Sequence, residues 1–421
     1  MCSDAPKRQE VPIGSYVARS QYGLNSVSAR NGNVPIIGMK DMTAGKITAN
    51  AWARTHVDES QLPEYLLRKG DILLNRTNSP DLVGKVSLWD REEEAVFASY
   101  LVRFQFDAAH ALPEFVNHYL NWEDSQQRLK QISTRGVSQA NINPTTFQNH
   151  FMVAWPPLPE QRRIAAVLDE WDRAITTAEK LAKAKLVRKY GLAHKLLDLC
   201  LVDHAPQGWV TALLGDLFEE RTTVGGSERL LAVTAGQGII DRDETGRKDT
   251  SADDKSNYKL IEPDDIGYNT MRMWQGVSAL SSLRGLVSPA YTIVRPNADV
   301  DAQFAAQLFK YHHMIHTFWR YSQGLVDDTL MLKFPQFSEI KINIPPLDVQ
   351  RETGKILSGA DLEVGQLHDL CNQLRLQKRG LMQKLLSGDW PVPPSIDRLL
   401  PGGQDIDEVV GTEVQSAAAA G

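Results

Sequence analysis

The sequence predicts an α+β protein with two pseudo-repeated α/β domains, each followed by a long helix, and with the two helices packed on each other. Three observations predict this fold: a motif that occurs twice, a heptad pattern that follows each copy, and a β-rich segment that precedes each copy. Self-similarity at a fixed spacing means two copies of one structural unit. The chain therefore has an internal pseudo-symmetry.

The repeated motif marks the start and the end of each long helix. The stretch PPLPEQR at residues 156–162 returns as PPLDVQR at 345–351, and KYGLAHKLL at 189–197 returns as KRGLMQKLL at 378–386. Both pairs are 189 residues apart, so the residues between them align without a gap. Because the residue before a proline is pushed out of the α region, the Pro-Pro pair ends a strand and sets the helix start.

Apolar residues recur in heptads along each predicted helix, interrupted by lysines such as Lys189 and Lys378 near the far ends. This period is typical of helices that pack on each other, and a helix over residues 160–198 is about 58 Å long. An ordinary core helix in each of two domains is the alternative. The residues expected to pack the helix pair are Ile164, Leu168, Trp171, Ile175, Leu192, Leu196, Leu357, Val364, Leu367, Leu374, Leu381 and Leu385.

Five segments follow from this pattern. Residues 1–155 and 201–344 form the two α/β domains, residues 156–200 and 345–388 form the long helices, and residues 389–421 form an acidic tail that we expect to be disordered. Each domain mixes short β-rich runs with Gly- and Asn-rich turns and has one helix near its end. The loops differ between the domains while the surrounding pattern is shared, which indicates two binding specificities on one scaffold.

The composition is that of an ordinary soluble protein. The 421 residues are 42% apolar and 23% charged, and we find no apolar run of membrane-spanning length, no secretory leader and no metal-type spacing of the three cysteines. We therefore expect a cytoplasmic protein without disulfides. The formal charge of −6 includes the acidic tail, and a lysine-rich stripe runs along residues 180–195. Such a stripe can bind phosphate but is also typical of a solvated helix face, so the charge permits DNA binding without requiring it.

No catalytic constellation is found in the sequence. The Pro-Pro pairs are followed by Leu158 and Leu347, where an adenine methyltransferase needs an aromatic residue, and residues 38–47 lack the spacing and the Ser or Thr of a P-loop. Three histidines, His312, His313 and His316, share a predicted helix without a nearby cysteine or carboxylate. Because a metal site needs such further ligands, we expect none.

The motifs resemble those of the specificity subunits of type I restriction-modification systems. Residues 136–143 (GVSQANIN) and 155–164 (WPPLPEQRRI) are similar to the end of a target recognition domain that enters the long helix of this family. Residues 22–24, 34–39 and 208–216, and GLMQKLLSG at 380–388, agree in order and spacing. The resemblance covers the chain from about Tyr16 to Gly388, and the second copy departs from it where Asp327 and Asp328 replace the Gln-x-Asn of the first.

The resemblance implies a non-catalytic subunit that reads double-stranded DNA. In this family, two target recognition domains at opposite ends of an antiparallel helix pair, a coiled coil, each read half of a bipartite site, and the pair sets the spacer. Two methyltransferase (modification) subunits dock on the helices, and restriction motor-nuclease subunits can join in a system for phage defence. The chain itself is expected to bind no cofactor: S-adenosylmethionine belongs to the methyltransferase partner, and ATP and Mg to a motor-nuclease partner. The alternatives are a subunit of a related methyltransferase-only or fused restriction system, or a coiled-coil scaffold without sequence readout.

Polar loop residues are the candidates for base contacts. Arginine can bond guanine bidentately and asparagine can do so with adenine, so loops with these residues suit direct readout. The same side chains also contact phosphates or stabilise turns, and this alternative stays open for each of them. The candidates are Asn75, Arg76, Thr77, Asn78, Arg135, Ser138, Gln139 and Asn141 in the first domain, and Asn269, Arg272, Trp274, Gln275, Tyr321 and Gln323 in the matching places of the second.

Overall fold

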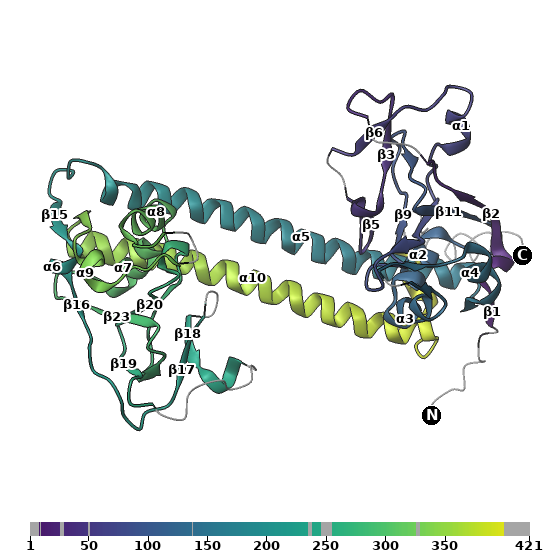
Figure 1. The fold of residues 1–421 in the computed structure, drawn as a ribbon. Coiled ribbons are helices and arrows are strands. Elements are labelled where there is room, and N and C mark those ends of the chain that lie inside the picture. Colours follow the sequence, from purple (N-terminus) through teal and green to yellow (C-terminus); the bar gives the residue numbers. More distant parts are fainter. Residues whose placement is uncertain are drawn as a thin grey trace, which may run out of the picture. The chain divides into compact units, whose positions relative to one another are not determined.

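The structure is a computed structural model that describes residues 8, 10–25, 29–48, 51–136, 138–234, 238–245, 255–325 and 329–399 (Figure 1). The chain divides into two compact units, residues 1–177 with 371–421 and residues 178–370. Each unit contains one α/β domain and one segment of each long helix, α5 (Leu158–Leu197) and α10 (Leu347–Ser387). The α+β class with two long helices is thereby confirmed.

The first domain is built around a six-stranded sheet of order β2-β11-β7-β9-β5-β4. All four residues of the central strand β7 are buried, so both of its faces are covered. Smaller sheets, β10-β3-β6, β12-β13-β8 and β1-β14, complete the domain. Its elements are β1 (Glu10–Pro12), η1 (Ile13–Tyr16), β2 (Val17–Tyr22), β3 (Val34–Ile37), η2 (Met39–Asp41), β4 (Met42–Thr43), β5 (Gly45–Ile47), β6 (Ala53–Thr55), α1 (Leu62–Tyr65), β7 (Ile72–Asn75), β8 (Thr77–Asn78), β9 (Val86–Leu88), β10 (Val96–Phe97), β11 (Leu101–Phe106), α2 (Pro113–Asn121), α3 (Glu123–Gln131), β12 (Thr134–Arg135), β13 (Ala140–Asn141), α4 (Pro144–His150) and β14 (Met152–Ala154).

The second domain has a four-stranded antiparallel sheet of order β16-β23-β20-β21. Three two-stranded sheets, β15-β24, β17-β18 and β19-β22, accompany it. Its elements are η3 (Asp198–Leu201), β15 (Val210–Leu213), α6 (Leu214–Leu217), β16 (Phe218–Glu220), β17 (Leu231–Thr234), β18 (Gly238–Asp241), η4 (Arg242–Thr245), β19 (Lys259–Ile261), β20 (Ile266–Asn269), η5 (Met273–Gln275), β21 (Ser278–Leu280), β22 (Gly285–Val287), β23 (Tyr291–Pro296), α7 (Ala302–Phe309), α8 (His312–Tyr321), α9 (Phe334–Ser338) and β24 (Lys341–Ile344).

The pseudo-repeat extends from the helices into the domains. The strand order β16-β23-β20-β21 repeats β2-β11-β7-β9 of the first domain, and in both cases the sheet is followed by two helices, a short helix and one strand that leads into a long helix. Much of this second part keeps the spacing of 189 residues, so that Phe115 in α2 corresponds to Phe304 in α7, both fully buried. The two domains are therefore one scaffold used twice.

One glutamine in each copy of the repeated motif ties the start of a long helix to its domain. The Gln161 side chain accepts a hydrogen bond from the Leu112 amide and donates to the carbonyls of His110 and Pro156, each at 2.8 Å. Gln350 makes the same three bonds, with the Asp301 amide and with the carbonyls of Asp299 and Pro345, each at 2.9 Å. Both side chains are 1% exposed. The glutamine recurs in both copies of the motif because its buried side-chain amide bonds three backbone groups at each junction of helix and domain.

We predict that Gln161→Ala lowers the free energy of unfolding of the first unit by at least about 2 kcal/mol, since each orphaned buried polar group costs roughly 1–3 kcal/mol. Chemical denaturation followed by hydrogen exchange of first-unit peptides measures this loss. The control is Arg162→Ala, an exposed neighbour whose replacement should stay within about 0.5 kcal/mol. Equal effects of the two substitutions would contradict the role of Gln161.

Ion pairs between the long helices explain the lysines that interrupt the heptads. In the first unit, Lys378 of α10 contacts Asp172 of α5 at 2.7 Å. In the second unit, Lys189 of α5 pairs with Asp361 of α10, and Lys189 and Asp361 correspond to Lys378 and Asp172 in the repeat. A further pair joins Lys185 to Glu363. From the first pair to the second, the residue number rises along α5, from Lys185 to Lys189, and falls along α10, from Glu363 to Asp361, so the helices pack antiparallel within the second unit. These two lysines belong to the basic stripe, and they neutralise carboxylates there.

The apolar seam merges with the domain cores at the two ends. Ile164, Leu168 and Leu385 are buried in one cluster with residues of the first domain. Leu357 is buried in the cluster of the second domain, against which Leu192 and Leu196 pack. Of the other predicted packing positions, Ile175 is buried, Leu381 packs on the first cluster, and Trp171, Val364, Leu367 and Leu374 are half-buried.

Each domain also has an Arg–Asp ion pair at its central sheet; both partners are buried in the first domain, and the aspartate is buried in the second. In the first domain, Arg103 of β11 and Asp71 are 3.4 Å apart, with side chains 2% and 3% exposed. In the second domain, Arg221 follows β16 and bonds Asp265 at 2.7 Å. Strand register places Arg221 opposite Ile293, in the position that Gln21 holds opposite Arg103. The buried aspartate is therefore kept while its arginine partner has moved to the neighbouring strand.

The prediction of a wholly disordered tail is wrong for its first residues. Residues 394–399 form η7 (Pro394–Leu399), Val392 is buried, and Ile396 packs on the core of the first unit. Asp397 forms an ion pair with Arg163 at 3.0 Å. These two apolar side chains, together with the ion pair, hold this segment on the domain. Residues 400–421 lie outside the described part of the chain.

The structure bears on the expectations about membranes and cysteines only for the residues that it describes. Among them, no helix combines the length and the apolar character needed to cross a bilayer. Cys200 and Cys371 are free and buried, and burial raises the pKa of the Cys200 thiol to about 12. Cys200 therefore stays protonated at neutral pH, which is unsuited to thiolate chemistry.

Candidate recognition surfaces

In the first domain, two loops predicted separately form one small sheet. Strand β8, with Thr77 and Asn78, pairs with β13, and β13 pairs with β12. The Asn141 amide donates to the Thr77 hydroxyl at 3.2 Å, and Asn78 accepts a bond from the backbone amide of Ser79. These three polar side chains thus stabilise the sheet and its turn, as the alternative interpretation of such residues allows.

The hairpin between β12 and β13 presents two of the predicted contact residues to solvent. The Gly136 amide donates to the Gln139 carbonyl at 2.7 Å and closes the turn. Ser138 and Gln139 are exposed at its tip. The side chain of Arg135 lies outside the described residues, although its backbone belongs to β12. The exposed hairpin tip therefore offers a hydroxyl and an amide for hydrogen bonding.

Asn75 is misplaced in the sequence-based prediction. It is the last residue of β7, it is 0% exposed, and neither polar atom of its side chain has a hydrogen-bond partner. Its backbone bonds those of Lys85 and Gly84 within the sheet. A side chain without solvent exposure cannot reach a base, so Asn75 is a core residue in this conformation.

Arg76 lies between β7 and β8, and its side chain packs on an aromatic ring. Its guanidinium carbon is 5.0 Å from the centroid of Tyr22, its backbone bonds Tyr100 and Ile142, and its Nε is buried without a partner. Tyr22 and Tyr100 are 50% and 49% exposed. Sequence reasoning missed both tyrosines as site residues, since only the fold brings the Tyr22 ring and the Tyr100 backbone to Arg76. An exposed aromatic ring next to an arginine is typical of nucleic-acid contacts.

Backbone hydrogen bonds define the matching place in the second domain. There, Thr270 donates to the Ala290 carbonyl and accepts from the Leu332 amide, as Arg76 does with Tyr100 and Ile142. Thr270, and not Arg272, is therefore the counterpart of Arg76. Arg272 is exposed two residues further on. The two domains share the backbone scaffold, but the arginine occupies a different position on it in each domain.

The remaining candidates of the second domain surround this place. Asn269 is half-buried and accepts a bond from the Met271 amide, and the Trp274 indole donates to the Met271 carbonyl at 3.0 Å. Gln275 is exposed at the end of η5, Gln323 is exposed and bridges Met331 through backbone bonds, and Tyr321 is half-buried at the end of α8. Because Leu332 bonds Thr270, the segments around residues 270 and 323 meet. Asp327 and Asp328 lie outside the described residues.

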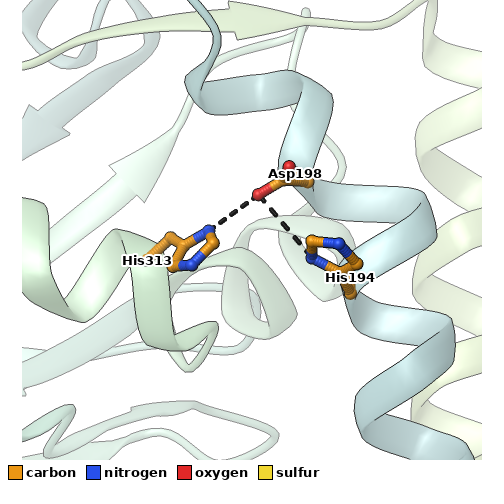
Figure 2. A group of neighbouring side chains, drawn as sticks. All are labelled: His194, Asp198 and His313. Atoms are coloured by element: carbon orange, nitrogen blue, oxygen red, sulfur yellow. Dashed lines mark hydrogen bonds and ion pairs between the residues drawn. The ribbon is translucent and has the colours of Figure 1, made fainter.

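The expectation that the α8 histidines lack a neighbouring carboxylate is wrong. The Asp198 carboxylate lies 2.7 Å from the His313 imidazole, and His194 lies on the other side of it (Figure 2). Asp198 and His194 precede His313 by more than one hundred residues, so sequence proximity could not reveal the group. His312 and His316 are exposed outside this group.

The sequence and the fold are similar to those of known proteins. Residues 23–186 match the family model of the type I restriction modification DNA specificity domain. A Methanocaldococcus jannaschii protein named as the MjaX specificity subunit of a type I restriction enzyme is 24% identical over 352 residues, which cover 79% of this chain and 81% of that protein. The EcoKI specificity subunit of Escherichia coli K12 is 22% identical over 231 residues, 51% of this chain and 49% of that protein.

Solved structures share the fold. The S subunit of a type I restriction-modification system from M. genitalium superposes with a TM-score of 0.60 at 17% identity, over 92% of this chain and 98% of that chain. A chain from a study of complex assembly and conformational transition of the type I system gives 0.55 at 16% identity, over 92% and 99%. The family model ends within α5, so the internal repeat extends the likeness to the second domain.

Proposed function

The chain is a member of the type I restriction-modification specificity subunits, and from this premise we propose that each domain reads one half of a bipartite site in double-stranded DNA. The observation that carries the proposal is one scaffold with two different surfaces. Arg76, packed on Tyr22, occupies the place that Thr270, followed by the exposed Arg272, occupies in the second domain. Different side chains on the same frame give two different base preferences.

The long helices supply a surface for partner subunits in this proposal. Several large apolar side chains on them are exposed, which is unusual for a helix that only faces water. They are Leu181, Val187 and Tyr190 on α5 and Ile356, Leu362, Leu370 and Leu376 on α10. We propose that two methyltransferase subunits dock there and that motor-nuclease subunits join the complex, as expected for a type I system.

Chemistry is assigned to those partners. S-adenosylmethionine would bind the methyltransferase subunits, and ATP and Mg a motor-nuclease subunit, while this chain contributes recognition only. The sequence motifs support this division. The Pro-Pro pairs are followed by Leu158 and Leu347 at the starts of α5 and α10, and not by the aromatic residue with which an adenine methyltransferase holds an extruded base. Since DNA and these cofactors are cytoplasmic, we propose that the complex acts in the cytoplasm.

Methylome sequencing tests the function. Cells with the chain and its methyltransferase partner should carry methylated adenines in one bipartite motif, and cells without the chain should lose that motif. The purified complex should also shift DNA with this motif more strongly than other DNA at moderate salt. A coiled-coil scaffold without readout predicts neither the methylation motif nor a sequence-selective shift.

We predict that Arg76→Ala changes the preferred base at one position of one half-site, with a loss of about 1–3 kcal/mol against the original base. The other half-site and the assembly with methyltransferase subunits should stay unchanged, because Arg76 belongs to one of two separate surfaces. Binding to DNA libraries followed by sequencing measures both half-sites. Arg272→Ala is the matched variant and should affect the opposite half. Uniform weakening on every sequence would instead identify Arg76 as a phosphate contact.

A further inference from the structure

Two histidines and an aspartate of the second unit converge from three elements. His194 lies near the end of α5, Asp198 begins η3, and His313 is the second residue of α8. Asp198 Oδ1 is 2.7 Å from His313 Nδ1 and 3.8 Å from His194 Nδ1, and one ligand atom from each residue lies within 4.8 Å of the others (Figure 2). The carboxylate is placed between the two imidazoles, as Figure 2 shows.

A tyrosine hydroxyl holds this group together. Tyr311 donates to Asp198 Oδ1 at 2.9 Å and lies 3.0 Å from His194 Nδ1 and 3.2 Å from His313 Nδ1. Burial raises the pKa of the Tyr311 hydroxyl, so it remains a donor, and hydrogen bonds from His313 and Tyr311 lower the pKa of Asp198, so it remains a carboxylate. The group thus brings two imidazole rings and one carboxylate together around one hydroxyl.

The fold does not require these residues, because the first half builds the same junction without them. The positions that correspond in the repeat to His194, Asp198, His313 and Tyr311 are Gln383, Ser387, Asp124 and Trp122. There, the Trp122 indole donates to the Gln383 side chain at 3.1 Å. Apolar packing, this neutral hydrogen bond and an ion pair between Arg379 and Glu123 therefore join the end of the long helix to the first domain without any histidine. The two histidines are an addition of the second half.

We propose that His194, Asp198 and His313 bind one divalent transition-metal ion of the Zn²⁺ or Co²⁺ type and fasten the end of α5 to α8. Two imidazoles with one carboxylate suit these ions, whereas Mg²⁺ and Ca²⁺ prefer oxygen ligands throughout. The side chains of His194 and His313 are 58% and 49% exposed, so an ion can enter and water can complete its coordination. Tyr311 orients the ligands from outside the coordination sphere.

A second group, His118 with Asp169 and Asp172, has similar spacing but a different balance of charge. Asp172 is already paired with Lys378 at 2.7 Å, so a lysine ammonium supplies the positive charge there. His118 contacts Asp169 at 2.8 Å and is 4% exposed. This group serves as the internal control for the proposal.

Titration of the untagged, chelator-treated full chain with Co²⁺ tests the site. We expect one ion per chain, with visible d–d absorption, and displacement of that absorption by one equivalent of Zn²⁺. The variants His194→Gln and Asp198→Ser install the residues that the first half carries at these positions, so the fold accommodates them. Each should remove stoichiometric binding, and Tyr311→Phe should weaken it by about 10–100-fold.

Three control variants should retain binding: His118→Gln, His316→Ala and His368→Ala. The first removes the group around Asp172 by installing the residue found at Gln307, and the other two remove exposed histidines of α8 and α10. Circular dichroism establishes that every variant is folded. The proposal is overturned if the native chain binds no Co²⁺ or Zn²⁺, or if the double variant of His194 and Asp198 binds as well as the native chain.

Discussion

Replacing Asp71 by alanine is expected to lower the free energy of unfolding of the first unit by about 3–5 kcal/mol, because it leaves the charge of Arg103 buried without its counter-ion. Asp71 also accepts bonds from the Arg68 amide at 2.9 Å and from the Gln105 side chain at 2.8 Å, and both donors would be orphaned. Burial lowers the pKa of Arg103, the response of a cation held away from water. Hydrogen exchange of peptides from β7 and β11, with and without denaturant, measures the loss.

The double variant with Asp71→Leu and Arg103→Met separates the cost of an unpaired charge from the value of the pair. Replacing a buried ion pair by apolar residues is often close to neutral, so the double variant should recover most of the stability. In the second unit, Asp265→Ala should destabilise β20 and leave the exchange of β7 unchanged. An Asp71→Ala protein within about 1 kcal/mol of the native chain would contradict the account.

The fold could be predicted from the sequence because the sequence contains two copies of one structural unit. An offset of 189 residues aligned both helix motifs, and the structure gives the reason for the aligned residues: Gln161 and Gln350 join backbone groups, and Lys378 and Lys189 pair with carboxylates of the facing helix. These interactions lie within one structural unit, so the residues that make them recur at the same positions in both copies of the sequence. The folded part of the tail lies after the repeat and has no second copy in the sequence. No pattern therefore predicted that Val392 and Ile396 are packed.

The recognition surfaces were only partly accessible, because a loop motif does not say which side chains face solvent. Asn75 and Arg76 are adjacent and both polar, yet the first is buried at the end of β7 and the second stacks on Tyr22. The approach of Tyr22 to Arg76, and of His194 and Asp198 to His313, is set by the packing of distant elements. Such contacts have no fixed sequence spacing, so only the fold reveals them.

Removing one heptad from each long helix is expected to shorten the spacer of the recognised DNA site by about three base pairs. The blocks are residues 178–184 of α5 and 367–373 of α10, which correspond in the repeat. Seven residues keep each apolar seam in phase and shorten a helix by about 10.5 Å, the length of about three base pairs at 3.4 Å each. Neither block contains a residue of the ion pairs Lys378–Asp172, Lys185–Glu363 or Lys189–Asp361, so the pairing of the helices is retained.

Methylome sequencing with the shortened chain distinguishes spacing from base recognition. Both half-site sequences should persist, because the residues around Arg76 and Arg272 are untouched, while the number of unspecified bases between them falls. Duplicating the same two blocks is the opposite variant and should lengthen the spacer by about three base pairs, which separates a true change of length from damage to the helices. Since a 40-residue helix is about 60 Å long, the half-site centres of the native site should lie at most about 17 base pairs apart. An active shortened or lengthened chain that still preferred the original spacer would show that α5 and α10 do not set it.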